Sequence, residues 1–64
     1  MKRLKELRLE KKLSQSQLAK AIGISQSAIA YWEIGRSIPN AQAIIILARY
    51  FNVTTDYLLG EKDY

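Results

Sequence analysis

The stretch that decides the fold is "LSQSQLAKAIGISQSAIAYWE", residues 13–33, in which the triplet Ser-Gln-Ser occurs twice. Each copy directly follows a large aliphatic residue, Leu13 or Ile24. Ser14 suits a helix N-cap because its hydroxyl can accept a hydrogen bond from an unpaired backbone N–H of the first turn. Ser25 stands at the equivalent place in the second copy. The two triplets therefore predict two helix starts.

The residues between the two serines agree with this interpretation. Gln17, three residues after Ser14, completes a capping box. Gly23 lies where a left-handed residue would end one helix and let the next begin. The distance along the chain from Ser14 to Ser25 allows a helix of about two turns, about 12 Å long, and a tight turn. Two short helices joined in this way predict a helix-turn-helix over about residues 14–33.

The rest of the chain shows similar start signals and no alternating pattern typical of a strand. An amphipathic helix is expected over residues 2–12, Asn40 and Thr54 are expected to cap two further helices, and Gly60 to end the last. No linker or change in composition divides the chain. We therefore predict an all-α fold, with residues 1–64 forming a single compact domain of five helices.

Composition narrows the classes of function. The chain has no cysteine and no histidine, so the commonest metal ligands and the commonest general base are absent. We expect no metal, no cofactor, no small-molecule ligand and no catalytic site, because the serines lack a candidate base. The longest apolar run, residues 43–48, is far shorter than the roughly 18 residues of a spanning helix, so we expect a cytoplasmic protein without a membrane partner.

The net charge of +4 is concentrated at one end of the sequence. Residues 1–12 hold six basic and two acidic residues, whereas the remaining chain has four of each. A basic end favours a polyanionic partner, with nucleic acid first and a membrane surface second. The alternative is a solvated helix face, which charge alone favours.

The two polar helix starts indicate which polyanionic partner the basic residues could bind. A helix N-terminus presents unpaired N–H groups and a partial positive charge, which favour a phosphate. We expect Gln15, at the first start, to hold the DNA backbone. Gln26 and Ser27, at the second start, are expected to enter the major groove, where a glutamine amide can bond to adenine N6 and N7. The alternative is that both triplets only cap and solvate helix ends.

Four stretches carry a resemblance to a known family: "RLKELR", "LSQSQLAKAIGISQSAIAYWE", "GRSIPN" and "FNVTTDYLLG". Through them residues 3–60 resemble the Cro/phage-repressor helix-turn-helix family, also called the xenobiotic response element (XRE) family of bacterial and phage transcription regulators. The resemblance implies a lambda-repressor-like fold and a sequence-specific, double-stranded DNA-binding regulator that acts as a repressor. The family's signature positions, which hold the two central helices together, fall on Leu18, Ala19, Gly23, Ile29 and Trp32.

The same resemblance implies roles for individual residues. Arg8 and Glu33 correspond to a structural ion pair that ties the first helix to the end of the third. The base-reading positions fall on Gln26, Ser27 and Tyr31. The phosphate-contacting positions fall on Lys12, Gln15, Ser25, Arg36 and Ser37. Three contacts are open to Tyr31: stacking, a phosphate reached through its hydroxyl, or a thymine methyl.

Assembly is the last expectation from the sequence. Ile45 and Ile46, with Tyr57 and Leu59 nearby, are expected on an outward face that forms a two-fold homodimer. Such a dimer would place two reading helices about 34 Å apart on a palindromic operator. A helical protein-interaction module, antitoxin-like or anti-repressor-like, that keeps the fold with weak or no DNA binding is the alternative function. The sequence leaves open whether the chain is complete or the DNA-binding head of a longer bacterial or phage protein.

Overall fold

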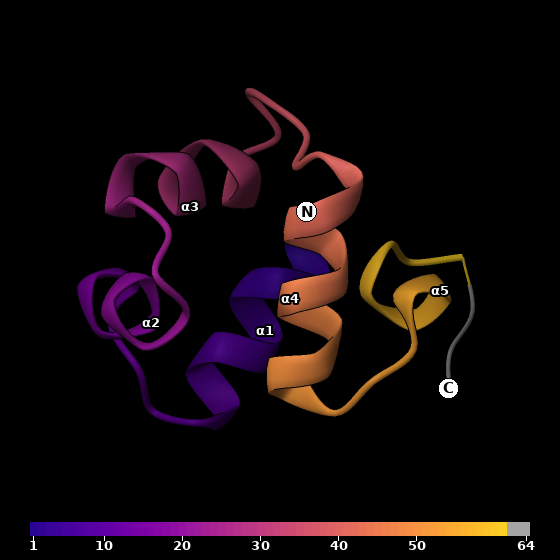
Figure 1. The fold of residues 1–64 in the computed structure, drawn as a ribbon, viewed down its shortest axis with the longest axis horizontal. Coiled ribbons are helices and arrows are strands. Elements are labelled where there is room, and N and C mark those ends of the chain that lie inside the picture. The colour runs from indigo at the N-terminus through magenta and orange to yellow at the C-terminus, as the bar shows by residue number, and fades with distance from the viewer. Residues whose placement is uncertain (62–64) are drawn as a thin grey trace.

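The computed structural model describes residues 1–61, and these residues form helices and no strand (Figure 1). The predicted all-α class and the five helices are confirmed. In chain order the helices are α1 Lys2–Glu10, α2 Gln15–Ile22, α3 Gln26–Glu33, α4 Ala41–Phe51 and α5 Thr55–Leu58. No helix within residues 1–61 has the length and apolar character needed to cross a membrane.

The predicted caps start the helices. The Ser14 hydroxyl accepts a 3.0 Å bond from the Gln17 N–H, and the Gln17 side chain accepts a 2.8 Å bond from the Ser14 N–H, which completes the capping box of α2. The Ser25 hydroxyl accepts from the Ala28 N–H at 3.2 Å. Asn40 and Thr54 begin α4 and α5 in the same way. Each start thus depends on contacts within four residues of sequence.

The helices are also followed by the same kind of turn, in which a residue has positive φ and the N–H of the next residue bonds to the carbonyl five positions before it. The positive-φ residues are Lys12, Gly23, Gly35, Asn52 and Gly60. For α1 this geometry corrects the expectation of a helix over residues 2–12. Lys12 turns left-handed at φ 58°, and the Leu13 N–H bonds to the Arg8 carbonyl, so the helix stops at Glu10. A lysine held there costs about 1 kcal/mol more than a glycine would.

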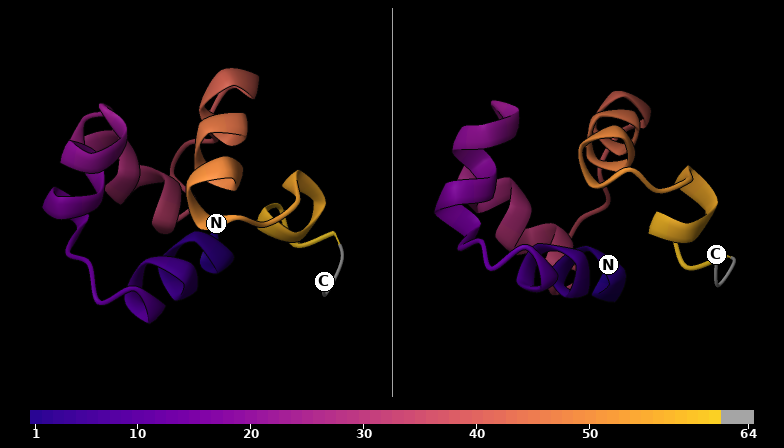
Figure 2. Two further views of the ribbon diagram at one scale, coloured as in Figure 1. Left: turned by 60° about the horizontal axis from the view of Figure 1, so that its bottom comes forward. Right: turned by 90° about the horizontal axis from the view of Figure 1, so that it is seen from below.

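Every helix contributes one large, fully buried side chain to a single core. These side chains are Leu4, Leu18, Ile29, Leu47 and Leu58, in the order of the helices. The α2–α3 pair lies on one side of the molecule and α4 with α5 on the other, while α1 runs along the lower edge of both views in Figure 2. Trp32 is buried in this core as expected, so it is not a stacking platform for bases.

Candidate nucleic-acid interface

The start of α3 presents the polar side chains expected to read bases. Ser25, Gln26 and Ser27 are all exposed, and the Ser25 and Ser27 hydroxyl oxygens lie 3.4 Å apart. Tyr31 follows Ser27 by four residues, so both side chains lie on one face of the helix. The Tyr31 side chain is exposed as well. The structure therefore brings the three predicted reading residues, Gln26, Ser27 and Tyr31, to the surface of a single short helix.

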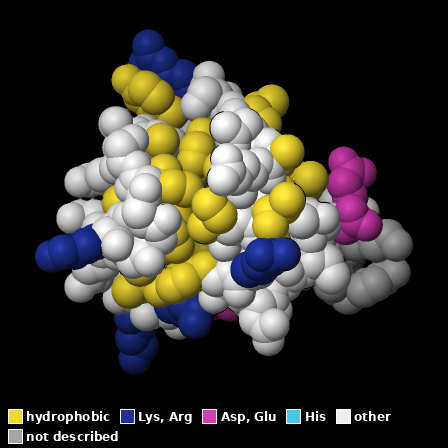
Figure 3. Space-filling model, viewed as in Figure 1, with side chains coloured by type: hydrophobic (Ala, Val, Ile, Leu, Met, Phe, Trp, Pro, Cys, Tyr) yellow, Lys and Arg dark blue, Asp and Glu magenta, His cyan; other side chains and the backbone are white. Residues whose placement is uncertain are grey.

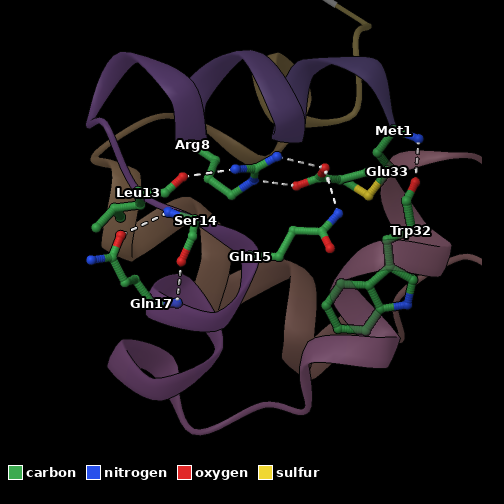
Figure 4. Close-up of polar contacts among 8 residues, drawn as sticks. All are labelled: Met1, Arg8, Leu13, Ser14, Gln15, Gln17, Trp32 and Glu33. Carbon is green, nitrogen blue, oxygen red and sulfur yellow. Dashed lines mark hydrogen bonds and ion pairs between the residues drawn. The ribbon is translucent and has the colours of Figure 1, made fainter.

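The start of α2 is fixed from inside the protein. The Gln15 side chain is half-buried, and its Nε2 donates a 3.1 Å hydrogen bond to Glu33 Oε1 (Figure 4). That bond ties the first turn of α2 to the last residue of α3. The first backbone N–H groups of α2 have no acceptor within the helix and point out of its N-terminus. Gln15 can thus offer its backbone N–H to a phosphate while its side chain is held in place.

Arg8 and Glu33 form the ion pair that the resemblance implied. Arg8 Nε lies 2.7 Å from Glu33 Oε2 and Nη2 lies 3.0 Å from Oε1, a two-pronged contact between α1 and α3. Arg8 Nη1 also donates to the Leu13 carbonyl at 2.7 Å, just before α2 (Figure 4). The Arg8 and Glu33 side chains are only 9% and 3% exposed. One guanidinium thus joins α1, α3 and the turn before α2.

The charges of this pair are mutually stabilised. Burial alone would raise the pKa of Glu33, but the hydrogen bonds from Arg8 and Gln15 hold that pKa below its ordinary value. The hydrogen bond to Glu33 raises the pKa of Arg8 against the opposing effect of burial. Within residues 1–61 no buried side-chain nitrogen or oxygen lacks a hydrogen-bond partner. The Glu33 carboxylate is therefore charged and rigidly held at the end of α3, between α1 and the start of α2.

A second contact supports the end of α3. The α-amino group of Met1 donates a 2.6 Å hydrogen bond to the Trp32 carbonyl (Figure 4). A cation at a helix C-terminus interacts favourably with the helix dipole, by about 0.3–1 kcal/mol. Sequence reasoning missed this contact because a backbone amine and a backbone carbonyl 31 residues apart leave no signature in the residue types.

The remaining predicted phosphate contacts lie in exposed turns. Lys12 is in the turn between α1 and α2, and Ser37 is in the loop between α3 and α4. Arg36, in the same loop, turns back toward α3, and its guanidinium carbon lies 4.9 Å from the centre of the Tyr31 ring. The three side chains are thus accessible, and one of them contacts a predicted reading residue.

The four residues expected to form a dimer face do not share one environment. Ile45 and Leu59 are exposed as expected, each by 44%. Ile46, expected on the outward face, is half-buried and lines an open groove of about 430 Å³ together with Trp32 and Ile38. Figure 3 shows hydrophobic side chains gathered in a band between the α2–α3 pair and α4. The predicted outward face therefore contains both exposed and half-buried residues.

Tyr57 differs from the expected dimer contact too. It is half-buried against the core, and the Arg3 guanidinium lies 4.2 Å from its ring centre. Its ring is thus engaged with α1 within the same chain. Among residues 1–61, the exposed large apolar side chain of this region is that of Leu59.

Comparison with known proteins agrees with this geometry. The sequence model of the helix-turn-helix family matches residues 4–58, which include all of α2 and α3. The chain belongs to the helix-turn-helix family. No solved structure shows a significant match to this helix-turn-helix chain.

Curated relatives of this helix-turn-helix chain carry regulatory names. The "HTH-type transcriptional activator BcrR" of Enterococcus faecalis is 38% identical over 95% of the chain and 30% of its own length. The "Uncharacterized HTH-type transcriptional regulator YobD" of Bacillus subtilis is 41% identical over 95% of the chain and 54% of its own length. The "Repressor protein C2" of Salmonella phage P22 is 33% identical over 89% of the chain and 26% of its own length. The chain thus spans between about a quarter and a half of each of these relatives.

Proposed function

We propose that this helix-turn-helix protein is a sequence-specific, double-stranded DNA-binding regulator of transcription that acts as a repressor in a bacterial or phage-infected cytoplasm. The observation that carries the proposal is the pair of helix N-termini on α2 and α3, two helices that are tied together by the hydrogen bond from Gln15 to Glu33. One terminus offers backbone N–H groups, and the other offers Gln26 and Ser27 in its first turn. A rigid pair of this kind fixes register on the DNA backbone while leaving polar side chains free for base edges.

The reading helix in this proposal is α3. Gln26, Ser27 and Tyr31 face the major groove, where the Gln26 amide bonds to adenine N6 and N7. Tyr31 contacts a thymine methyl or the adjacent backbone. Each role relies on side chains that are exposed at the surface of α3.

Phosphates are held around this helix. The backbone N–H of Gln15 and the hydroxyls of Ser25 and Ser37 supply neutral contacts, and Lys12 supplies a charged one. Neutral donors set register without releasing counterions, whereas each lysine contact adds to the salt dependence of binding. No enzymatic step is part of the proposal.

Repression follows from binding alone, because a protein seated on a promoter excludes polymerase without further chemistry. The relatives include a protein named as an activator and another named as a repressor. In vitro transcription from a promoter carrying the preferred site distinguishes the two. We expect transcript levels to fall as the protein is added, and a rise would overturn the repressor assignment.

A two-fold dimer on a palindromic operator completes the proposal. The exposed side chains of Ile45 and Leu59 provide the apolar contacts. Sedimentation on a palindromic duplex is expected to give two chains per duplex. One chain per duplex at saturation would refute the dimer while leaving DNA binding intact.

Selection from a pool of random duplexes tests the function itself. A sequence-specific regulator enriches one family of sites over its non-specific affinity, typically by 10³ or more in binding constant. Enrichment is the expected result. A pool that remains random after several rounds would contradict the proposal and favour the protein-interaction module, which keeps the same fold without reading DNA.

A further inference from the structure

The side chain of Arg36 lies on the reading face of α3 rather than out in the loop. Its guanidinium carbon is 4.9 Å from the centre of the Tyr31 ring. A guanidinium within about 6 Å of an aromatic ring centre is attracted to the ring face. Within residues 1–61, the ion pairs that the structure shows belong to other arginines, Arg3 and Arg8. The ring of Tyr31 is thus what positions Arg36.

The backbone explains why the side chain returns to the helix. Gly35 ends α3 with φ +78°, and the Arg36 N–H then donates a 2.9 Å bond to the Tyr31 carbonyl. This closure reverses the chain and places residue 36 next to residue 31. Tyr31 in turn lies one helical turn after Ser27. The guanidinium therefore continues the row of exposed polar groups that begins with Gln26.

We propose that Arg36 reads a guanine in the major groove, with Tyr31 as the platform that holds its guanidinium. This inference rests on the proposed function. From the sequence alone Arg36 is expected on a phosphate, but the contact with the Tyr31 ring occupies only one side of the guanidinium. Its N–H donors lie in the plane and stay free, in the fork geometry that fits guanine O6 and N7.

The platform also explains how an exposed loop arginine can be selective. A long, free side chain loses rotamer freedom when it binds, which weakens a directional contact. Stacking on Tyr31 restricts that freedom before DNA arrives. A phosphate contact gains less from such a restriction, because phosphates lie all along the backbone and accept from many directions.

The spacing along α3 predicts where the guanine lies. Gln26 and Tyr31 are five residues apart, a rise of about 7.5 Å along the helix. The two side chains therefore reach neighbouring positions in one groove. A half-site should contain a guanine, read by Arg36, within a few base pairs of the adenine read by Gln26.

The test measures binding to the selected duplex and to duplexes in which each guanine is replaced in turn. Replacing the guanine read by Arg36 should weaken binding of the unaltered protein by about 5- to 150-fold. It should change binding of Arg36→Ala by less than about twofold. Replacing that guanine by 7-deazaguanine, which lacks the N7 acceptor, should weaken binding of the unaltered protein and leave Arg36→Ala unchanged.

Four matched variants distinguish the contribution of the Tyr31 ring from that of the positive charge of Arg36. Arg36→Lys keeps the charge but loses the fork, so it should bind random DNA normally and lose the guanine preference. Tyr31→Ala should weaken the guanine preference by about two- to fivefold, and Tyr31→Phe, which keeps the ring face, should retain it. Lys12→Ala, in a turn away from α3, should weaken binding to every duplex alike.

Two outcomes would overturn the proposal, and they are distinguishable. If Arg36→Ala weakens all duplexes equally and no guanine replacement distinguishes it from the unaltered protein, then Arg36 holds a phosphate and only this inference fails. If the selection yields no preferred duplex, the proposed function fails with it. Both Arg36 and Tyr31 are exposed, so thermal unfolding of each variant should match the unaltered protein and exclude a folding defect.

Discussion

Replacing Arg8 by alanine should strongly destabilise the protein. The change removes two hydrogen bonds to Glu33 and one to the Leu13 carbonyl, and it leaves a carboxylate that is 3% exposed without its cation. Removing one partner of a buried pair costs about 3–5 kcal/mol. For a domain of this size each 1 kcal/mol lowers the unfolding midpoint by about 4–8 °C. Arg8→Ala should therefore lower the midpoint by at least about 12 °C.

Thermal unfolding followed by circular dichroism measures this shift. The matched control is Glu6→Ala, because the Arg3–Glu6 pair is longer, at 3.7 Å, and the Glu6 side chain is exposed. That control should cost no more than about 1 kcal/mol. Replacing both buried partners with apolar residues, as Arg8→Met with Glu33→Leu, should recover most of the stability lost in Arg8→Ala. An Arg8→Ala midpoint within about 2 °C of the unaltered protein would show that the pair contributes little.

Three further predictions follow from the same structure. Because folding lowers the pKa of Glu33, its carboxylate stabilises the folded protein at neutral pH, and this stabilisation is lost as the pH falls below about 4. The urea midpoint of the unaltered protein should therefore decline below this pH. The midpoint of Glu33→Gln, which has no carboxylate at this position, should decline less steeply. Lys12→Gly should raise the free energy of unfolding by up to about 1 kcal/mol, since glycine adopts the φ of 58° without strain, and a lower denaturation midpoint would contradict this. Acetylating the Met1 amine should lower stability by about 0.3–1 kcal/mol at low salt, and an unchanged melting curve would show that its contact with the Trp32 carbonyl is unimportant.

The helix starts could be predicted from the sequence because their causes are local. Ser14 and Ser25 bond to backbone groups three residues away, and such contacts depend on residue type and spacing alone. The sequence pattern predicts an end of α1 that is two residues too late, because Lys12 adopts a left-handed conformation that lysine disfavours. Only the packing of the whole fold decides that the chain must turn there.

Contacts between distant parts of the chain are harder to predict from the sequence. Arg8 and Glu33, 25 residues apart, were paired through the family resemblance and not from spacing. The stack of Arg36 on Tyr31 depends on the closure at Gly35, whose φ the residue type permits but does not require. Ile46 was expected outside because the periodicity of α4 does not show that its neighbour across the groove is α3.

Binding of Gln26→Ala to the preferred and a scrambled duplex, across a series of salt concentrations, tests the assignment of the reading face most directly. We predict a loss of about 1–3 kcal/mol on the preferred duplex, little change on the scrambled one, and an unaltered salt slope. Lys12→Ala serves as the contrast, because it should weaken both duplexes and lower the slope by about one unit. If Gln26→Ala weakens both duplexes equally, or neither, then Gln26 only begins a helix and α3 does not read bases as proposed.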